Sequence, residues 1–470
     1  MMINNFFILL RQELLISAII FILLFIKLGK DRSNESILHV INLLLCLNFA
    51  AGFIPMLEGE LFNSMFATSK LVVLEKNILN LAIWIISMQS YAWLKTHQHV
   101  IEFYILLLTS LLGMFFLISS GNLLMFYLGL EMSTIPLAAA ANFDLTKRQS
   151  SEAAFKLIIS SAFSSSLLLL GISFIYGSTS TLIFSEIPVH LIYSPLQIFA
   201  FILLVSGFAF KISAVPFHLW TADVYEGAPV AVTAFLSVVS KAAVLFTFTT
   251  FLYKVFTPMA NIWYAILILL SLATILIGNL FALRQDNLKR FLAFSSIAQV
   301  GFILIGISGS SQQGFSSLVY FIIIYVFSNL AAFGVISLVS AVTGKENIND
   351  FKGFYKNNPI LSWVLTIALF SLAGVPPTAG FFGKLFLLMA GAANGNYWII
   401  AFAALNMVIS FYYYLKVVKA IFMDENEAPM QTIAIPTYPK VAMLICVAGI
   451  ILTSFVTFIY DYIQSLSISL

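Results

Sequence analysis

Charged residues are scarce in this sequence, and cysteine is nearly absent. Asp, Glu, Lys and Arg make up 9% of the 470 residues, hydrophobic residues make up 61%, and the mean hydropathy is +1.01. A soluble globular domain carries about 25% charged residues, so this composition excludes one. Cys46 and Cys446 both lie in apolar segments without neighbouring ligand residues, which argues against a disulfide framework, a zinc site and an iron–sulfur cluster in this chain.

Motifs for nucleotides and redox cofactors are also missing. The sequence has no Walker-type phosphate loop, no Gly-rich dinucleotide fingerprint and no paired histidines for haem. We therefore expect no cofactor in this chain, and any energy has to come from an ion gradient or from a partner. The net charge of +3 says little by itself, and no nucleic-acid partner is expected.

What the sequence does contain is a succession of apolar runs, each near the length of a membrane span. Fourteen such runs lie near residues 6–29, 36–55, 71–94, 100–118, 121–142, 150–176, 195–220, 229–253, 262–283, 289–308, 315–342, 360–390, 396–422 and 438–463. Each run is long enough to cross a bilayer as a helix with some tilt. The sequence therefore predicts an all-α polytopic membrane protein with about fourteen transmembrane helices.

Lys and Arg are distributed unequally between the predicted loops. Most follow odd-numbered segments, whereas the other side has only Lys70, Lys76, Lys254 and, near the N-terminus, Arg11. Because positive residues stay in the cytoplasm, the odd-numbered loops are expected there and both termini on the outer, periplasmic side. The bacterial inner membrane is the expected location, although a chain encoded in an organelle would show the same pattern of spans and charges.

Four ionisable residues remain inside the predicted spans. They are Lys211, Lys241, Lys384 and Glu131, the last being the only acid near the middle of a span. A charged residue at a helix centre costs roughly 3 kcal/mol in a membrane, so four such residues would be expensive without a function. Ionisable residues in membrane spans generally mark an ion path, and we expect one here.

Two of these lysines lie next to prolines that interrupt a helix. Lys211 precedes Pro216 by five residues, and Lys384 follows Pro376 and Pro377. Proline removes a helix hydrogen bond and clashes with the preceding turn. Pro216 and Pro376 are 160 residues and five segments apart, and an odd number of spans reverses direction in the membrane. The spacing predicts two inverted five-helix repeats, each with a broken helix.

The predicted organisation has four parts. These are an N-terminal three-helix segment at 1–99, a first repeat at 100–253, a second, inverted repeat at 262–422, and a C-terminal helix at 436–470. The repeat is imperfect, because the helix that corresponds to that of Lys241 carries Tyr412 to Tyr414 and lacks a central cation. The two repeats are expected to have the same arrangement of helices and to differ in function.

A proton relay is the function that these residues favour. Glu131 would pair with Lys211 across adjacent helices, Lys241 would be a relay midway, and Lys384 would be the gate of the second half. Breaking the pair would weaken the hold of Lys211 on its proton. The alternatives are that Glu131 and Lys211 only set helix register, and that Lys384 extends to an interface.

His218, two helical turns after Lys211, is a secondary candidate for proton transfer, although a histidine near a helix end is more often a packing residue. Asp223 and Glu226 are expected in a loop as solvated or capping acids. Further polar residues could line a hydrated axis or join helices: Ser237, Ser240, Ser295, Ser296, Gln299, Tyr320, Tyr325 and Asn329.

Four stretches together resemble one known family. They are the Lys-Ile-Ser-Ala-Val-Pro-Phe-His-Leu-Trp stretch that runs on to Ala-Pro at 211–229, Gly-Leu-Glu at 129–131, Lys-Arg-Phe-Leu-Ala-Phe-Ser-Ser-Ile-Ala-Gln-Val-Gly at 289–301, and Gly-Val-Pro-Pro-Thr-Ala-Gly-Phe-Phe-Gly-Lys at 374–384. In these motifs the chain is similar to the proton-conducting membrane subunits of respiratory complex I and their relatives, the multisubunit cation/proton antiporters. The resemblance covers nearly the whole chain.

The resemblance implies a role within a larger enzyme. Glu131 and Lys211 would be the coupling pair, Lys241 the central relay, and Lys384 the residue that controls exchange with one side of the membrane. NADH, FMN, iron–sulfur clusters and quinone would be bound by partner subunits, with no redox centre in this chain. The implied partners are antiporter-like and small membrane-arm subunits of NADH:quinone oxidoreductase and the lipid bilayer.

Two features of the sequence distinguish this chain from other antiporter-like subunits of the family. The chain ends soon after the fourteenth predicted span, where the largest antiporter-like subunit continues with a long lateral helix, and Lys384 stands where the middle subunit typically has Glu. Two other functions stay open. A subunit of a Na⁺ or K⁺/H⁺ antiporter would use the same residues without an electron donor, and a membrane scaffold would use them for assembly only.

Overall fold

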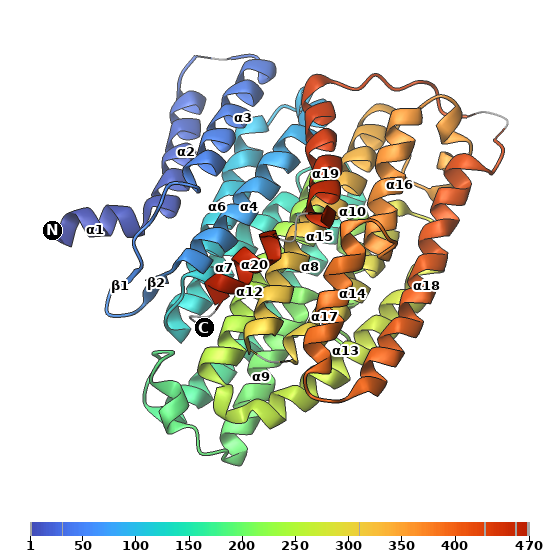
Figure 1. Cartoon of the computed structure of the whole chain (residues 1–470). Coiled ribbons are helices and arrows are strands. Elements are labelled where there is room, and N and C mark those ends of the chain that lie inside the picture. Colours follow the sequence, from blue (N-terminus) through green and yellow to red (C-terminus); the bar gives the residue numbers. More distant parts are fainter. Residues whose placement is uncertain (1, 31, 310, 427–428, 456–457, 468–470) are drawn as a thin grey trace.

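The computed structural model describes residues 2–30, 32–309, 311–426, 429–455 and 458–467 (Figure 1). The N-terminal part contains α1 (Met2–Leu9), α2 (Arg11–Leu28), α3 (Asn34–Ala51), β1 (Gly59–Leu61), β2 (Phe66–Thr68), α4 (Lys70–Gln89) and α5 (Tyr91–Leu94). The C-terminal part contains α19 (Thr437–Phe455) and α20 (Phe458–Leu466). Between these parts lie two runs of long helices.

The first run contains α6 (Val100–Ile118), α7 (Leu123–Ala141), α8 (Arg148–Thr179), η1 (Ile187–His190), α9 (Pro195–Ile212), α10 (Leu219–Gly227), α11 (Val230–Phe235), η2 (Leu236–Ser240), α12 (Lys241–Thr250) and η3 (Phe251–Val255). The second contains η4 (Thr257–Met259), α13 (Ala260–Ala282), α14 (Leu288–Ile307), α15 (Ser311–Thr343), η5 (Ile348–Phe351), η6 (Phe354–Lys356), α16 (Pro359–Ala373), α17 (Ala379–Ala392) and α18 (Tyr397–Phe422). Here η2 and η3 are π-helical turns, and the other η elements are 3₁₀ turns.

The predicted helical membrane architecture is confirmed. Twelve helices in the described part of the chain are long and apolar enough to cross a membrane. The other two predicted spans are α2, which contains Arg11, Glu13 and Lys27, and the segment that is divided into α16 and α17. Large apolar side chains are exposed on the outer helices, as on Leu43, Phe163, Leu269 and Leu444, which is the surface that lipid requires.

Three local features differ from the sequence prediction. The first predicted span is divided near Leu10 into α1 and α2, and α1 projects away from the bundle (Figure 1). The loop after α3 contains an antiparallel hairpin of β1 and β2 that the all-helical prediction missed. In place of one C-terminal helix, the described residues form α19 and α20 on either side of residues 456–457, which lie outside the described residues.

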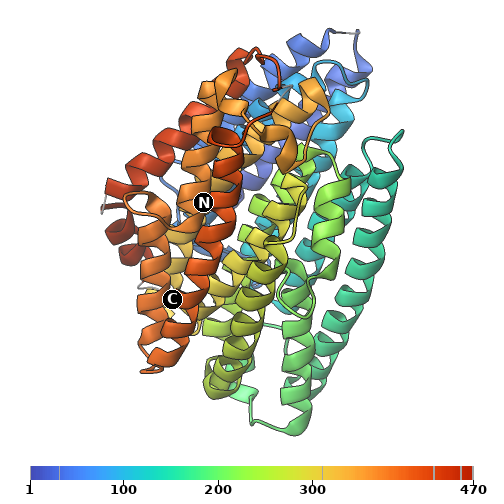
Figure 2. The same cartoon turned by 90° about the vertical axis from the view of Figure 1, so that its right-hand side faces the viewer.

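The loops gather alternately at two ends of the bundle. At one end, ion pairs join Lys27 to Glu102 at 2.7 Å and Lys289 to Glu346 at 3.0 Å, all from or beside odd-numbered loops. At the other end, a cavity joins the β1–β2 hairpin, residues 183–188 and the end of α12. The α2–α3 connection lies at the top of Figure 1 and the segment near residue 190 at the bottom. The side-by-side helices in Figure 2 therefore connect two opposite faces.

The order of elements is the same in the two central runs. In the first, α6, α7 and α8 are followed by the broken pair α9 and α10 and then by α11 and α12; in the second, α13, α14 and α15 are followed by the broken pair α16 and α17 and then by α18. Corresponding members are five spans apart and so run in opposite directions. The relation of the two runs as inverted repeats, with the domain boundaries given above, stays a prediction.

The centre of the bundle is formed by α11, α12, α14 and α15. Every residue of α14 except Arg290 is buried, although α14 carries Ser295, Ser296 and Gln299 in its middle. A helix that is buried on all sides and still carries polar side chains has to satisfy them within the protein. These three residues therefore indicate where the polar interior of the protein lies.

Candidate functional site

The first broken helix positions Lys211. α9 ends at Ile212, Ser213 takes a left-handed conformation with φ 65°, and α10 begins at Leu219. The backbone groups that the break releases find partners, because Trp220 Nε1 donates to the Phe210 carbonyl at 3.1 Å and Val215 N–H donates to Thr274 Oγ1 at 3.0 Å. The predicted break is confirmed, and its polar groups are satisfied as a membrane interior demands.

Lys211 is held by two hydroxyl groups. Its Nζ donates to Thr134 Oγ1 at 2.6 Å and to Ser161 Oγ at 2.8 Å. Glu131 lies one helical turn before Thr134 on α7, near enough for its charge to act on Lys211. Within the described residues, however, no ion pair within 4.0 Å joins Lys211 to Glu131, and Glu131 Oε1 is buried without a hydrogen-bond partner.

The expected direct pair of Glu131 and Lys211 is therefore not formed in this structure. The physical reason is that Thr134 and Ser161 already accept hydrogen bonds from the ammonium group. Both residues do lie at one site, between α7 and α9.

Lys241 lies at the junction of the π-helical turn η2 and α12 and is 2% exposed. Its Nζ donates to Ser296 Oγ on α14 at 2.8 Å and lies 5.5 Å from the centre of the Tyr225 ring. Single π turns inside α-helices are frequent at functional sites, because they shift the direction of the following side chains. Nothing in the sequence signals this turn.

Lys384, on α17, reaches back into the second break. Its Nζ donates to the carbonyls of Leu372 at 2.8 Å and Ala373 at 3.2 Å, at the C-terminal end of α16, where a cation is favoured. It also lies 4.9 Å from the centre of the Phe302 ring. The side chain is fully buried, so the alternative that Lys384 extends to an interface is wrong.

Polar groups connect the surroundings of Lys384 to those of Lys241. The Leu372 carbonyl, which accepts from Lys384, also accepts from Gln299 Nε2 at 2.9 Å, and Gln299 donates to Tyr414 Oη at 3.3 Å. Tyr414 Oη is hydrogen-bonded in turn to Ser295 Oγ, next to the Ser296 that holds Lys241. α14 thus carries a series of polar side chains from one lysine to the other.

Other members of the predicted axis divide into two groups. Ser237 Oγ accepts from Asn329 Nδ2 at 2.6 Å and is hydrogen-bonded to Tyr325 Oη at 3.1 Å, beside Lys241 on η2 and α15. Tyr320 lies apart, because its hydroxyl donates to the Thr453 carbonyl of α19 at 2.7 Å. Tyr320 therefore joins α15 to α19, whereas Ser237, Tyr325 and Asn329 form a hydrogen-bonded group beside Lys241.

His218 directly precedes α10 and is 7% exposed. Its Nδ1 is buried and has no hydrogen-bond partner within the described residues. Its place two helical turns after Lys211 does not bring it onto the same helix face, because the left-handed turn at Ser213 redirects the chain, and the hydrogen bonds of Lys211 go to α7 and α8. His218 therefore lies in the break, and among the described residues no hydrogen bond joins it to Lys211.

Asp223 and Glu226 belong to α10 rather than to a loop. Arg290 Nη1 donates to Asp223 at 2.7 Å and to Glu226 at 2.9 Å, and Lys156 Nζ donates to Asp223 at 2.7 Å. These ion pairs join α8, α10 and α14 beside the first break. The expectation of solvated or capping acids is corrected, since both carboxylates are paired.

Buried ionisable side chains are not confined to the four predicted residues. Glu13, Glu75 and Lys76 are also buried, with exposures of 3%, 2% and 0%, and Lys76 forms an ion pair with Glu13. The sequence places Lys76 near a membrane face, because the residue lies near the start of its predicted span. The signal was present in the sequence, since Glu13 and Lys76 both lie several residues inside predicted spans.

No group of three or more His, Cys, Asp or Glu side chains that could hold a metal ion occurs among the described residues. The functional side chains described above are lysines, carboxylates, hydroxyls and amides. These groups bind and pass protons, and the lysines are placed on different broken or distorted helices.

Comparison with known proteins gives consistent results. A family model described as NADH:quinone oxidoreductase/Mrp antiporter, TM, matches residues 120–410. Over 414 residues the chain is 47% identical to a protein named NADH-quinone oxidoreductase subunit N from Azobacteroides pseudotrichonymphae genomovar. CFP2, covering 87% of this chain and 86% of that protein. The similarity therefore extends over most of both sequences.

Two solved structures show the same fold. A chain of respiratory complex I from Thermus thermophilus, with bound aureothin, matches with a TM-score of 0.81 and 26% identity, covering 96% of this chain and 98% of that one. A chain of the Mrp complex from Dietzia sp. DQ12-45-1b matches with a TM-score of 0.84 and 19% identity, covering 98% and 95%. At 19% identity the second likeness concerns the fold alone.

Proposed function

The chain belongs to the family of NADH-quinone oxidoreductase subunit N, and on that premise we propose that it moves protons across the membrane through Glu131, Lys211, Lys241 and Lys384. It acts as a membrane-arm subunit of the complex, in which electron transfer from NADH to quinone drives translocation. NADH, FMN, iron–sulfur clusters and quinone are bound by partner subunits. Other antiporter-like and small membrane subunits are its neighbours.

One observation carries the proposal. Lys211, Lys241 and Lys384 are each held by neutral oxygen atoms: hydroxyls for the first two and backbone carbonyls for the third. Within the described residues none of the three has a carboxylate within 4.0 Å. A buried lysine without a fixed counter-ion can gain or lose its proton without leaving an unpaired carboxylate behind, which a relay requires.

The arrangement of Glu131 and Lys211 provides a means of setting the proton in motion. Glu131 lies beside Lys211 but does not contact it, so the two can exist as a separated or a joined pair. A carboxylate that approaches Lys211 stabilises the ammonium, and one that moves away favours release of the proton. We assign this change to the step that partner subunits drive, and Lys241 and Lys384 receive the proton in turn.

The proposal includes an orientation of the chain in the membrane. The face that joins the odd-numbered loops carries most of the Lys and Arg residues, so we place it in the cytoplasm and both termini on the periplasmic side of a bacterial inner membrane. Asp223 and Glu226, paired with Arg290, lie at the cytoplasmic side of the first break. His218 stays a secondary candidate for proton transfer in the break.

A subunit of a multisubunit Na⁺ or K⁺/H⁺ antiporter is the second candidate. Its support is the common fold with the Mrp complex, at 19% identity, whereas sequence identity of 47% is shared with proteins named as NADH-quinone oxidoreductase subunits. Purification of the chain from its membrane separates the two functions. Flavin and iron–sulfur subunits should accompany it, and the recovery of antiporter subunits alone would contradict the first proposal.

The direct test is Lys211→Ala in the assembled complex. NADH-driven proton uptake into inside-out vesicles and NADH:quinone turnover should both fall by about tenfold or more, as is usual when a proton-transferring group is removed. Lys345→Ala, at an exposed lysine, is the matched control and should change neither rate. Unchanged pumping in an intact Lys211→Ala complex would contradict the relay.

A further inference from the structure

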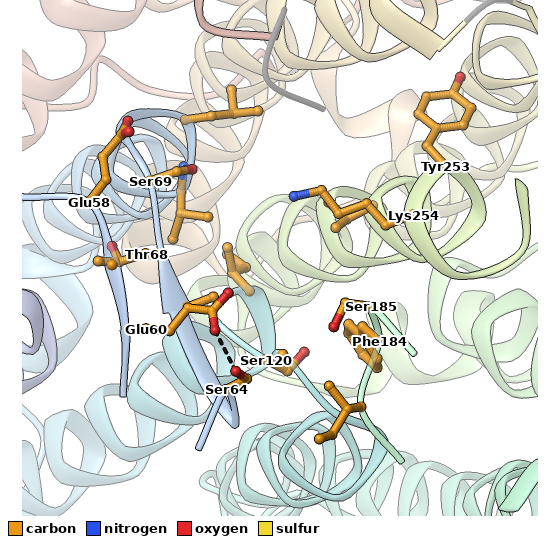
Figure 3. Close-up of a pocket in the computed structure, with 18 of the residues that line it drawn as sticks. Glu58, Glu60, Ser64, Thr68, Ser69, Ser120, Phe184, Ser185, Tyr253 and Lys254 are labelled. Carbon is orange, nitrogen blue, oxygen red and sulfur yellow. Dashed lines mark hydrogen bonds between the residues drawn. The ribbon is translucent and has the colours of Figure 1, made fainter. Parts of the chain in front are cut away.

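A cavity of about 630 Å³ lies at the end of the bundle opposite to the basic loops (Figure 3). The β1–β2 hairpin, the start of α4, residues 183–188 and the end of α12 with η3 enclose it. Lys254 extends into the space between the hairpin and α12, and Glu58 and Glu60 line the cavity from the hairpin side (Figure 3). Lys254 is exposed, so the cavity communicates with solvent.

Glu75 is the unusual residue of this cavity. It lines the cavity wall from α4, yet its side chain is 2% exposed and its Oε1 has no hydrogen-bond partner within the described residues. The other two carboxylates of the cavity differ, because Glu58 accepts from the Lys70 N–H at 3.1 Å and Glu60 from Ser64. A buried carboxyl without a partner is costly for a protein to keep and is seldom retained without a function.

Charged residues face Glu75 from several elements. Lys254 on η3 and Lys76 on α4 both act on it electrostatically, and Lys76 is paired behind it with Glu13 of α2. Adjacent residues of an α-helix project about 100° apart, so Glu75 can face the cavity while Lys76 faces α2. The groups thus form a sequence from solvent inward: Lys254, Glu75, and then the pair of Lys76 and Glu13.

We propose that this cavity is a proton-exchange vestibule, in which Glu75 releases a proton to water on the face opposite to the basic loops. In this step the Glu75 carboxyl gives one proton to a water molecule and becomes a carboxylate, whose charge Lys254 balances. Burial favours the protonated form of a carboxyl and a nearby ammonium favours the ionised form. The approach of the flexible Lys254 side chain therefore decides whether the proton stays.

The vestibule deepens the proposed function and rests on it. Lys241 begins α12, and Lys254 lies on η3 in the same helical span, Val230–Val255. One helical span thus carries both Lys241, the central lysine of the relay, and Lys254 of the vestibule. Glu75 and Lys254 add an exchange point that is separate from Lys384, which lies on α17 in the second break.

The test uses Glu75→Gln in the assembled complex, with Glu58→Gln as the matched control. Both substitutions remove one carboxylate from the same cavity, but only Glu75 is buried and unpartnered. We expect Glu75→Gln to lower coupled turnover and proton uptake by about tenfold or more. Glu58→Gln should leave both unchanged. Equal effects of the two substitutions, or no effect of Glu75→Gln, would overturn the proposal.

The pH profile separates proton release from a structural role. In oriented vesicles, turnover of the unmodified complex should fall as the pH on the vestibule side is lowered, because Glu75 then retains its proton. The residual activity of Glu75→Gln should lose this dependence, and Glu75→Asp should restore it in part. A dependence on Na⁺ at constant pH, in place of the dependence on pH, would show a cation site and contradict the assignment.

A labelling experiment covers the case in which Glu75→Gln fails to assemble. Val72→Cys places a thiol in the cavity wall, and Leu43→Cys places one on the exposed apolar face of α3, both with Cys46→Ser. A membrane-impermeant cationic thiol reagent added from the vestibule side should modify Cys at position 72 and not at position 43. Lack of reaction at position 72 would exclude a hydrated vestibule.

The outcome distinguishes this inference from the proposed function. If Lys211→Ala abolishes pumping while Glu75→Gln does not, the relay stands and the vestibule is wrong. If neither substitution affects pumping in an intact complex, the proposed function fails. Loss of pumping in both variants, with the altered pH profile only in Glu75→Gln, supports both.

Discussion

The three lysines of the proposed relay differ in burial and in their partners, since Lys241 and Lys384 are buried and Lys211 is partly exposed. Lys211 and Lys241 donate to hydroxyl groups, which can turn and both donate and accept. Lys384 donates to two backbone carbonyls, which can only accept. A hydroxyl can pass a proton onward, whereas a carbonyl holds the ammonium in place. At the residue scale, Lys384 is thus suited to retain its proton until another group accepts it.

Replacement of Lys384 by Arg tests whether the residue has to titrate. Arg keeps the positive charge at the end of α16 but does not lose its proton under physiological conditions. We expect Lys384→Arg to assemble and to lose NADH-driven proton uptake by about tenfold or more. The control is Lys345→Arg at an exposed position. If Lys384→Arg pumps at the normal rate, Lys384 supplies only charge.

The buried pair of Glu13 and Lys76 predicts an asymmetry in stability. Removal of one partner from a buried ion pair costs about 3–5 kcal/mol, because the other charge is left unpaired, whereas apolar replacement of both is often neutral. Glu13→Gln should therefore lower the thermal stability of the isolated complex, and Glu13→Leu combined with Lys76→Met should lower it less. Midpoints from thermal unfolding in detergent measure both. Equal loss in the two variants would show that packing, not charge, dominates.

At the scale of single elements, the two broken helices are the features that create the site. Each break leaves backbone carbonyls at the end of one half-helix without a helical partner. The Trp220 side chain donates a hydrogen bond to such a carbonyl at the first break, and the Lys384 side chain does so at the second. The second break depends on a close approach, because a Cβ atom at Gly380 would lie 1.7 Å from the Ser371 carbonyl oxygen. α17 can approach the end of α16 only because residue 380 lacks a side chain.

Gly380→Ala should therefore disturb the second break. The clash involves backbone, which cannot move aside cheaply, so α17 has to shift and carry Lys384 with it. We expect a smaller yield of assembled complex, or a complex whose proton uptake is reduced. Gly177→Ala on α8 is the matched control, because nothing lies within 4 Å of its Cβ position, and it should be neutral or slightly stabilising. Normal uptake in Gly380→Ala would show that the break tolerates displacement.

At the scale of the whole molecule, the loops divide into two faces, and charge decides which face is which. Lys345 lies in a loop of the basic face, and Asn63 lies in the turn of the β1–β2 hairpin at the other face. The introduced thiol of Lys345→Cys should react with an impermeant maleimide in inside-out vesicles only, and that of Asn63→Cys in intact cells only. The reverse pattern would invert the proposed orientation and place the vestibule in the cytoplasm.

Much of the fold could be predicted from the sequence, because its signals are local. A membrane span requires about 20 apolar residues, and the predicted segments correspond to the helices of the structure, including both breaks near Pro216 and Pro376. The sequence did not predict the shorter elements or the local distortions of helices. The separation of α1 from α2 and the π turn before Lys241 have no breaker residue, and the strands of the β1–β2 hairpin are only three residues long, too short for a clear periodicity.

The sequence by itself determined which residues are out of place in a bilayer. Lys211, Lys241, Lys384 and Glu131 are recognisable because charge in a long apolar run is costly, whatever the neighbours are. Only the tertiary structure decided their partners. Glu131 and Lys211 lie at one site without contact, Lys384 turns inward to α16, and Glu75 lies buried at a cavity, because contacts between helices far apart in sequence depend on packing and not on local composition.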